Sequence, residues 1–217
     1  MQHHHKVLLD TVRGYFGDCI RFYGSADRDI TCAVSQCARF VHSPKRSHEV
    51  ALERIGQYLK ATMEEGLILQ PNLECLDIDC YVDADFAGLW PHEDKLDPVC
   101  VKSRTGHVIC FANCPIVWKS RLQDTIALST MEAECMALSS AMKELIPFQE
   151  LFRGVAGSIG LEASKTTFRT SVHEDNEGAL TLAKLEPGRH TPRSKHYAIN
   201  PVAVNFLLLR QDKSKFK

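Results

Sequence analysis

The stretch LECLDIDCYVDADF (residues 73–86) is where the sequence changes from a helical to a strand period. Apolar and polar side chains alternate strictly through it, in the order Leu76, Asp77, Ile78, Asp79, Cys80, Tyr81, Val82, Asp83. Alternation with a period of two is typical of a β-strand with one buried face. We therefore expect a strand here, and the neighbouring segments can be interpreted around it.

Three further segments resemble strands: SRTGHVICFAN (103–113), PIVWKSRL (115–122), after a turn at Cys114-Pro115, and TTFRTSVHED (166–175). A long helix begins within ALSTMEAECMALSS (127–140), and Pro147 is expected to break or kink it. A short helix, NEGALTLAKL (176–185), follows the fourth strand. This order predicts an α/β fold (an α+β mixed sheet). The first three strands are expected to be antiparallel, with the fourth parallel beside the first.

The N-terminal part has a helical period instead. Residues 30–66 are expected to form a helical hairpin outside the sheet, with Ser47 as the N-cap of its second helix and Gly66 at its end. QPN (70–72) marks a boundary, so we expect two domains, 1–70 and 71–217. Beyond the last strand, EPGRHTPRSKH (186–196) is a basic loop, and Pro201 opens a terminal helix that ends near Arg210.

Composition excludes several classes of protein. The 217 residues carry a net charge of -1, which is no nucleic-acid footprint by itself, so local basic runs matter more than the total. No apolar stretch is long enough for a signal peptide or a membrane span. The 9 cysteines are odd in number and include no C-x-x-C pair. We expect an intracellular protein of the cytoplasm or nucleus, with reduced cysteines and no zinc site.

Two glutamates near the start of the long helix lie two positions apart and cannot share a face. Glu132 completes a capping box with Ser129. Steps of three or four from Glu132 reach Ser139 and Lys143, which we expect to be solvated. The same steps from Glu134 follow the apolar stripe of Leu138, Ala141, Leu145, Phe148 and Phe152.

Glu134 is therefore expected to face inward, where an ionised carboxylate needs a cation, a basic partner or a raised pKa. The alternative is a glutamate at the edge of the stripe that reaches water. Two more acids lie at strand ends: Asp83, with Asp85 beside it, and Asp175, which could instead be a helix N-cap. Three acids that converge without a basic residue predict a site for Mg²⁺ or Mn²⁺.

Several of these segments, in this order, resemble the ribonuclease H domain of Ty1/copia-type retrotransposon polyproteins: YVDADFAGLW, KSRTGHVI, VWKSRLQDTIALSTMEAECMALS, HEDNEGALTLA and TPRSKH. The segment from RDITCAVSQ to EEGLIL resembles the part that joins the reverse transcriptase to that domain. The matches run from about residue 28 to about residue 197. The resemblance implies a ribonuclease H-like fold preceded by a small helical remnant of the reverse transcriptase.

By position, the resemblance assigns the catalytic and metal-binding acids to Asp83, Glu134 and Asp175. It implies hydrolysis of RNA in RNA–DNA hybrids by two Mg²⁺ (or Mn²⁺) ions about 4 Å apart. Such a substrate needs a basic surface, and the remainder of a reverse transcriptase is a possible partner. The candidate contacts, each of which could also be an ordinary solvated charge, are Lys102, Arg104, Lys119, Arg121, Arg189, Arg193 and Lys195.

The family pattern has a further acid where this chain has Ala198, and a Tyr-His pair where it has Asn200-Pro201-Val202-Ala203. We therefore expect three carboxylates instead of four, and impaired cleavage. The alternative is a catalytically inactive, truncated or co-opted transposon relic without polymerase activity. A third possibility is an integrase, but this sequence contains no His/Cys zinc module of the kind expected of that class.

Overall fold

The computed structural model describes residues 30–41, 43–66, 68–72, 74–88, 90, 97, 99–158 and 169–184. The chain divides into two compact units, Met1–Ile68 and Leu69–Lys217, which are described separately below. Three expected features lie outside the described residues: the basic loop at 186–196, the terminal helix from Pro201 to Arg210, and the gap at Ala198.

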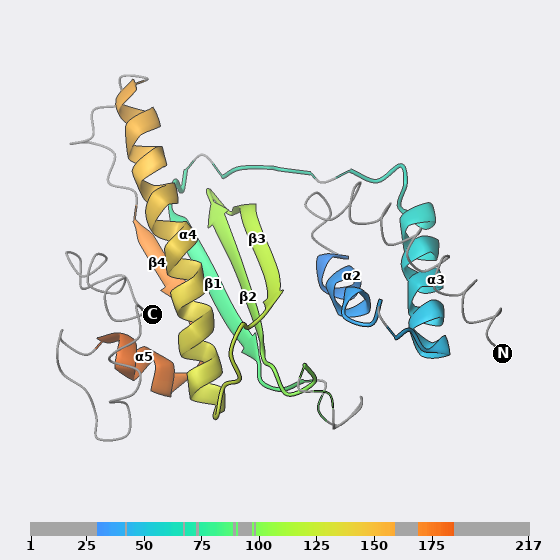
Figure 1. Ribbon diagram of the computed structural model, residues 1–217. Helices are drawn as coiled ribbons and strands as arrows, with labels where there is room; N and C mark the ends of the chain where they lie inside the picture. Colours follow the sequence, from blue (N-terminus) through green and yellow to red (C-terminus); the bar gives the residue numbers. More distant parts are fainter. Residues whose placement is uncertain are drawn as a thin grey trace. The chain divides into compact units, whose positions relative to one another are not determined.

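The larger unit is built on a four-stranded mixed sheet (Figure 1). Its strands are β1 (Ile78–Asp85), β2 (Arg104–Phe111), β3 (Cys114–Leu122) and β4 (Thr170–His173), in the spatial order β3-β2-β1-β4. β1 pairs antiparallel with β2, and β2 pairs antiparallel with β3. β4 lies parallel to β1, so the expected mixed topology is confirmed.

The turn between β2 and β3 lies two residues earlier than expected. Ala112 and Asn113 have φ angles of 50° and 65°, in the left-handed region, and Cys114 already pairs with Phe111. Two successive residues with positive φ are typical of the tight hairpin turns whose twist suits antiparallel strands. The expectation of a turn at Cys114-Pro115 is therefore wrong. Ala112 and Asn113 make the turn, and Cys114 and Pro115 already lie in β3.

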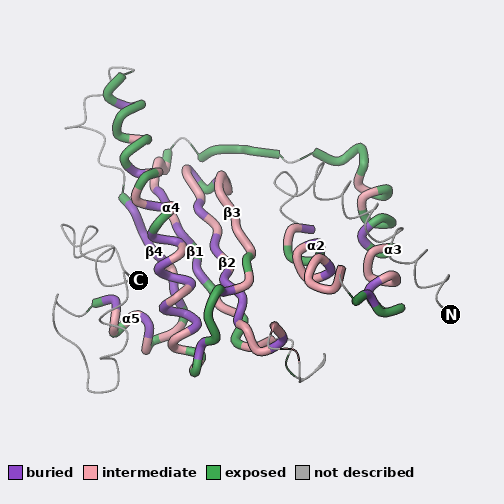
Figure 2. The backbone as a smooth tube through the Cα atoms, viewed as in Figure 1, coloured by how far each residue is buried: buried purple, intermediate pink, exposed green. Residues whose placement is uncertain are grey.

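The long helix α4 (Thr130–Ser158) lies across one face of the sheet and contributes much of its core. The tube in Figure 2 is buried where α4 faces the central strands. The helix continues through Pro147, so the sequence expectation of a break there is wrong, while a kink at Pro147 stays a prediction. Lys143 is exposed as expected, but Ser139 is 7% exposed, because the buried face of α4 is wider than one stripe. The buried cluster consists of Ile78, Cys80, Val82, Ile109, Ala137, Leu138, Ala141, Met142, Leu145, Val172 and Ala183.

The short helix α5 (Glu177–Lys184) follows β4 after a three-residue connection and buries Ala179 and Ala183. This connection consists of Glu174, Asp175 and Asn176, the residue directly before the helix. The direct passage from β4 to α5 therefore places two acids at the end of the sheet.

The smaller unit contains the expected pair of helices, α2 (Thr31–Ala38) and α3 (Arg46–Ala61). Its core is formed by Ile30, Val34, Cys37 and Ile55. The helix α3 begins one residue before Ser47, with Lys45 at the N-cap position, and ends five residues before Gly66. Ser47 is therefore not the cap; instead His48 Nδ1 accepts a hydrogen bond from the Lys45 amide at 3.0 Å. The packing of this hairpin outside the sheet stays a prediction.

No helix in the described part of the chain combines the length and the hydrophobicity that crossing a bilayer requires. Among the described residues no disulfide joins two cysteines. Cys80, on β1, is fully buried in the core, and this burial raises the pKa of its thiol to about 12. A thiol with so high a pKa stays protonated and packs as a small apolar group.

Candidate metal centre

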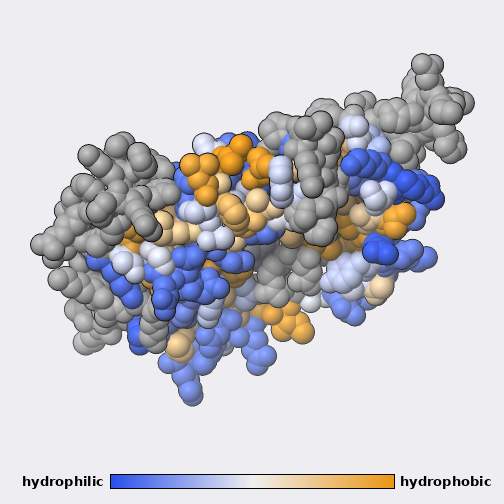
Figure 3. All heavy atoms as spheres, turned by 90° about the horizontal axis from the view of Figure 1, so that it is seen from below, coloured by the Kyte–Doolittle hydropathy of each residue, from blue (hydrophilic) through white to orange (hydrophobic). Residues whose placement is uncertain are grey.

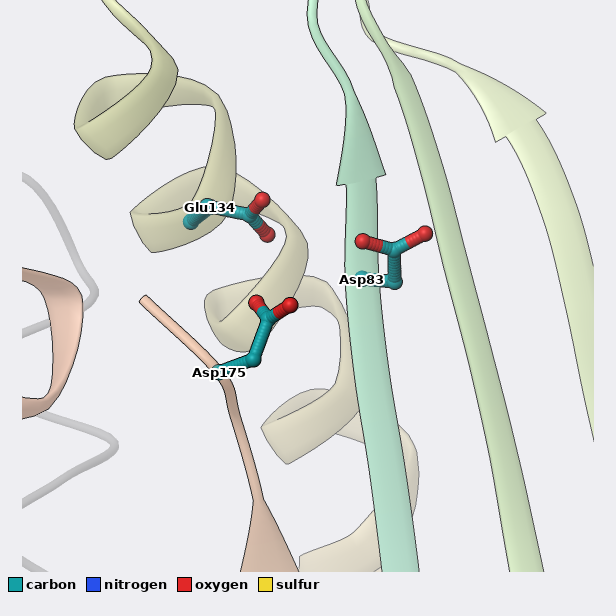
Figure 4. Close-up of side chains that lie close together, drawn as sticks. All are labelled: Asp83, Glu134 and Asp175. Atoms are coloured by element: carbon teal, nitrogen blue, oxygen red, sulfur yellow. The ribbon is translucent and has the colours of Figure 1, made fainter. Parts of the chain in front are cut away.

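Three carboxylates from three different elements meet at one end of the sheet. They belong to Asp83 on β1, Glu134 on α4 and Asp175 after β4. Each contributes one carboxylate oxygen, and these three oxygens lie within 4.8 Å of one another. In Figure 4 the three side chains point toward a common space between the strand and the helix. Residues 51 and 41 positions apart in the sequence are thus brought together by the parallel β1–β4 pairing and by the packing of α4.

The site lies where β4 stops and β1 continues. The parallel pairing ends at Tyr81 and His173, whereas β1 runs four residues further, to Asp85. A hollow of about 330 Å³ lies at this point, lined by Tyr81, Val82, Asp83, His173, Glu174 and Asp175. The shorter edge strand therefore opens the space in which the acids gather.

Glu134 is the buried member of the three. It is 7% exposed, while Asp83 and Asp175 are exposed. Burial, followed by repulsion from Glu174, Asp83 and Asp175, raises the pKa of Glu134 to about 8, although a hydrogen bond from the Ala84 backbone amide opposes this rise. Glu134 Oε2 is buried without a hydrogen-bond partner. This inward orientation confirms the helical phase argument, and the alternative of a glutamate that escapes to water is wrong.

The neighbouring glutamate, Glu132, has the expected structural role. Its amide donates to Ser129 Oγ at 3.1 Å, and its Oε2 accepts from the Leu128 amide at 2.6 Å. The carboxylate thus caps the amide one position before Ser129 rather than that of Ser129 itself. Ser129 and Glu132 together satisfy backbone donors that the start of a helix leaves unpaired.

Asp83 and Asp85 lie two positions apart, on the same face of the strand, so the strand period alone does not decide which of them joins the site. The tertiary structure decides it. The carboxylate of Asp85 lies over Gly88 in the turn after β1, where a Cβ on Gly88 would come 2.1 Å from Asp85 Oδ2. Gly88 is therefore needed for this close approach, and the Asp85 carboxylate is directed to the turn. Asp83 is the strand acid that joins Glu134 and Asp175.

A fourth acid, which the sequence reasoning missed, lies beside these three. Glu174 is 6% exposed and lines the hollow with Asp83 and Asp175. Burial raises the pKa of Glu174 to about 7; the Asn176 amide lowers it, and repulsion from Asp175 and Asp83 adds to the rise. Its position directly before Asp175 was the one signal available in the sequence.

The donor set suits a hard divalent cation. Carboxylate oxygens are the ligands that Mg²⁺ and Mn²⁺ prefer, and these ions take few ligands other than oxygen. Within the described residues neither Glu134 nor Glu174 has a basic partner, and each has a buried oxygen without a hydrogen bond. A divalent ion held by Asp83, Glu134 and Asp175 would relieve their mutual repulsion, so the residues present fit such an ion.

The four described candidates for nucleic-acid contacts differ in their surroundings. Arg104 is 6% exposed and donates from Nη1 to Ser120 Oγ at 3.2 Å. Lys119 pairs with Glu144 of α4, which also contacts His107 Nε2 at 3.0 Å. Arg104 and Lys119 thus hold the fold together in addition to any other role.

Lys102 and Arg121 lie nearer the surface. Both are attached to Asp124: Lys102 Nζ donates to its carbonyl oxygen at 2.8 Å, and Arg121 Nη2 donates to its carboxylate at 2.7 Å. The Arg121 side chain is 60% exposed, whereas Lys102 and Lys119 are half-buried and Arg104 is buried. Arg189, Arg193 and Lys195 lie outside the described residues.

An aromatic pair borders the hollow. The rings of Tyr81 and His173 stack with their centroids 4.5 Å apart, and His173 Nε2 lies 2.8 Å from Asp79 Oδ1. Tyr81 is 50% exposed.

Figure 3 views the molecule from the end of the sheet that carries the acids, and hydrophilic residues occupy much of the coloured surface there. Trp118, on β3, is half-buried.

Comparison with known proteins gives consistent relatives. The chain is 30% identical over 188 residues to the Retrovirus-related Pol polyprotein from transposon RE1 of Arabidopsis thaliana, and 28% identical over 188 residues to that from transposon RE2 of the same plant. It is 32% identical over 168 residues to the Retrovirus-related Pol polyprotein from transposon TNT 1-94 of Nicotiana tabacum. These matches cover 87%, 87% and 77% of this chain, but only 12%, 12% and 11% of the respective relatives. No protein-family model and no solved structure matches the chain.

Proposed function

Because this chain belongs to the family of copia-type retrotransposon Pol polyproteins, we propose that it is a ribonuclease H-like fragment of such a polyprotein. In this proposal residues 71–217 form the ribonuclease H-like domain, and residues 1–70 are a helical remnant of the reverse transcriptase or connection region. The substrate is the RNA strand of an RNA–DNA hybrid. The remainder of a reverse transcriptase is a possible partner.

The observation that carries the proposal is the convergence of Asp83, Glu134 and Asp175 within 4.8 Å. Their arrangement on a strand, a helix and the connection after a parallel strand agrees with the carboxylates that the family resemblance assigns. The buried, unpartnered oxygen of Glu134 supports the same conclusion, since leaving a carboxylate oxygen desolvated costs free energy unless a proton or a cation compensates it.

In this mechanism the chain's own residues hold and orient the reacting groups. Asp83 and Asp175, both exposed, would bind the metal on the side open to substrate, and Glu134 would bind it from the protein interior. When bound, Mg²⁺ or Mn²⁺ supplies Lewis-acid activation of the attacking water and of the leaving oxygen. The exposed Tyr81, held against His173, borders the hollow that the sugar-phosphate strand would enter.

We propose that this activity is impaired, because Ala198 stands where the family pattern has an acid. The second candidate is an inactive or co-opted relic that keeps the fold. The two differ in one respect that can be measured. A relic would show no metal-dependent cleavage at all, whereas an impaired enzyme would show slow cleavage that requires the three acids.

The test is cleavage of a labelled RNA–DNA hybrid by the full chain, with Mg²⁺, Mn²⁺ or a chelator. We expect slow, metal-dependent cleavage of the RNA strand that Asp83→Asn, Glu134→Gln and Asp175→Asn each abolish. Glu132→Gln is the matched control, because it removes a neighbouring carboxylate of the same helix and should retain cleavage. Cleavage that survives Asp175→Asn, or that the chelator does not affect, would refute the proposed site.

A further inference from the structure

The strand that carries Asp83 also presents an aromatic ring beside it. Tyr81 lies on the same face of β1 as Asp83, because alternate residues of a strand share a face. Cys80 and Val82, on the opposite face, are buried in the core. Two residues along a strand span about 7 Å, and Tyr81 and Asp83 both line the hollow at the end of β4. The ring is therefore a direct neighbour of the proposed metal site.

The neighbouring strand holds this ring in one orientation. Tyr81 and His173 are the last pair in the β1–β4 register, and their rings stack at an interplanar angle of 12°. His173 Nε2 lies 2.8 Å from Asp79 Oδ1, within hydrogen-bond distance. Asp79 thus fixes the imidazole, and the imidazole fixes the phenol ring. A ligand that packs on Tyr81 meets a side chain that is already ordered, so little conformational entropy is lost on binding.

Part of the Tyr81 ring is open to such a ligand. Tyr81 is 50% exposed, and because His173 covers one face of the ring, the open surface lies on the other face and the edge. A fixed aromatic face in water is the surface on which proteins stack unpaired nucleobases. The hollow of about 330 Å³ is at the lower end of the range of about 300–1,000 Å³ for small-ligand pockets. Its size suits one nucleotide rather than a duplex.

We propose that Tyr81, stacked on His173, receives one unpaired nucleobase of the strand whose phosphate lies at Asp83 and Asp175. A base inside a duplex has both faces covered by its neighbours, so only an unpaired base offers a face to the ring. The preferred substrate is then a hybrid whose RNA strand continues as a single strand. This inference rests on the proposed function in one respect, since a cation held by the acids must offset their repulsion of the phosphate.

The variants separate the ring from the rest of the side chain. Tyr81→Ala removes the stacking surface, whereas Tyr81→Phe keeps it. Tyr58→Ala is the matched control, because it makes the same change at a tyrosine that is 39% exposed and belongs to the smaller unit. Asp175→Asn tests the proposed metal site itself. On the ligand, an abasic nucleotide in the single-stranded extension removes one base and leaves the sugar-phosphate strand intact.

The experiment measures binding of labelled hybrids to the full chain by fluorescence anisotropy. Ca²⁺, which also takes oxygen ligands, replaces Mg²⁺ to slow cleavage. We expect Tyr81→Ala to bind the extended hybrid about tenfold more weakly than the unmodified chain does, as for the loss of one stacked base. Tyr81→Phe and Tyr58→Ala should bind it like the unmodified chain. A fully paired hybrid should bind equally to the unmodified chain and to Tyr81→Ala.

The abasic ligand shows whether the lost affinity belongs to a base. One abasic position next to the duplex should weaken binding to the unmodified chain by the same factor as Tyr81→Ala, and should weaken binding to Tyr81→Ala no further. A purely structural role of the Tyr81–His173 pair would not produce this coupling. The abasic comparison on the unmodified chain decides the question even if Tyr81→Ala does not fold.

Two results would overturn the inference, and they differ in what else they overturn. If no abasic position weakens binding, or Tyr81→Ala binds the extended hybrid like the unmodified chain, the ring receives no base. The metal site then still stands, provided that Asp175→Asn loses the binding that depends on Ca²⁺. If Asp175→Asn binds every hybrid like the unmodified chain, the phosphate is not held at the acids, and the proposed site and the inference are both wrong.

Discussion

Asn176 Oδ1 accepts a hydrogen bond from the Ala179 backbone amide at 3.0 Å, so Asn176 is the residue that caps the start of α5. Asp175, one position earlier, could have been the N-cap on sequence grounds alone. Because Asn176 has this role, the Asp175 carboxylate is left to join Asp83 and Glu134. The division of roles between two adjacent residues is the local reason that an acid remains available at the end of β4.

This division predicts opposite effects on stability. Asn176→Ala should lower the free energy of unfolding by about 1 kcal/mol, the usual loss for an N-cap. Asp175→Asn should not lower it in the absence of metal, because it removes a repelling charge and no cap. Urea denaturation in chelator measures both. A loss for Asp175→Asn as large as that for Asn176→Ala would mean that Asp175 is the structural residue.

Divalent metal should stabilise the folded chain. A ligand that binds only the folded state at a hundred times its Kd contributes about 2.7 kcal/mol, so Mg²⁺ or Mn²⁺ should raise the melting temperature. Asp175→Asn should abolish this rise, whereas Glu132→Gln should keep it, since Glu132 caps the helix rather than facing the cluster. Differential scanning fluorimetry with and without metal gives the comparison, and a rise that persists in Asp175→Asn contradicts the assignment.

The metal-free chain should lose stability as the pH rises. Burial, then repulsion from Glu174, raises the pKa of Glu134 from 4.5 to about 8. The folded state therefore holds this proton more tightly than the unfolded state does, and the penalty of ionisation appears between about pH 4.5 and pH 8. Glu134→Gln cannot ionise, so its stability relative to the unmodified chain should increase across this range.

The measurement is urea denaturation in chelator at several pH values from about 4 to about 9 for both proteins, which covers that range. Saturating Mg²⁺ should remove the loss of stability that the unmodified chain shows as the pH rises, because the ion favours the ionised carboxylate. A difference between the two proteins that is constant with pH would show that Glu134 does not titrate with a raised pKa.

The packing of α4 on the sheet should be sensitive to truncation at its buried face. Leu138→Ala should lower the free energy of unfolding by about 2–5 kcal/mol, the range for large-to-small changes in a core. Leu151→Ala is the matched control on the same helix, because Leu151 is 63% exposed and Leu138 is fully buried. Equal losses for the two variants in denaturant titrations would contradict the orientation of α4.

Restoring the acid that the family pattern places at residue 198 tests the proposed impairment. Ala198→Asp should increase the rate of hybrid cleavage, since it adds a carboxylate to a site that otherwise has Asp83, Glu134 and Asp175. Single-turnover cleavage with Mn²⁺ compares the variant with the unmodified chain. Equal rates would mean that the gap at Ala198 does not limit the activity.

Periodicity in the sequence was sufficient for the architecture. Alternation from Leu76 to Asp83 predicted β1, and the mixed order of the sheet followed from which connections contain a helix. The helical phase of Glu134 against Leu138 and Leu145 predicted its burial. These inferences succeeded because strand and helix periods are local properties of the chain, and burial of one face follows from them.

Contacts between distant residues decided the rest. Asp83 was separated from Asp85 by the turn at Gly88, and Lys119 was directed to Glu144 on another element. Glu174 is buried at the hollow that lies where β4 ends beside a longer β1. Whether a carboxylate is solvated, paired or desolvated depends on which elements pack around it. For that physical reason the sequence alone identified three acids, and only the tertiary structure brought a fourth beside them.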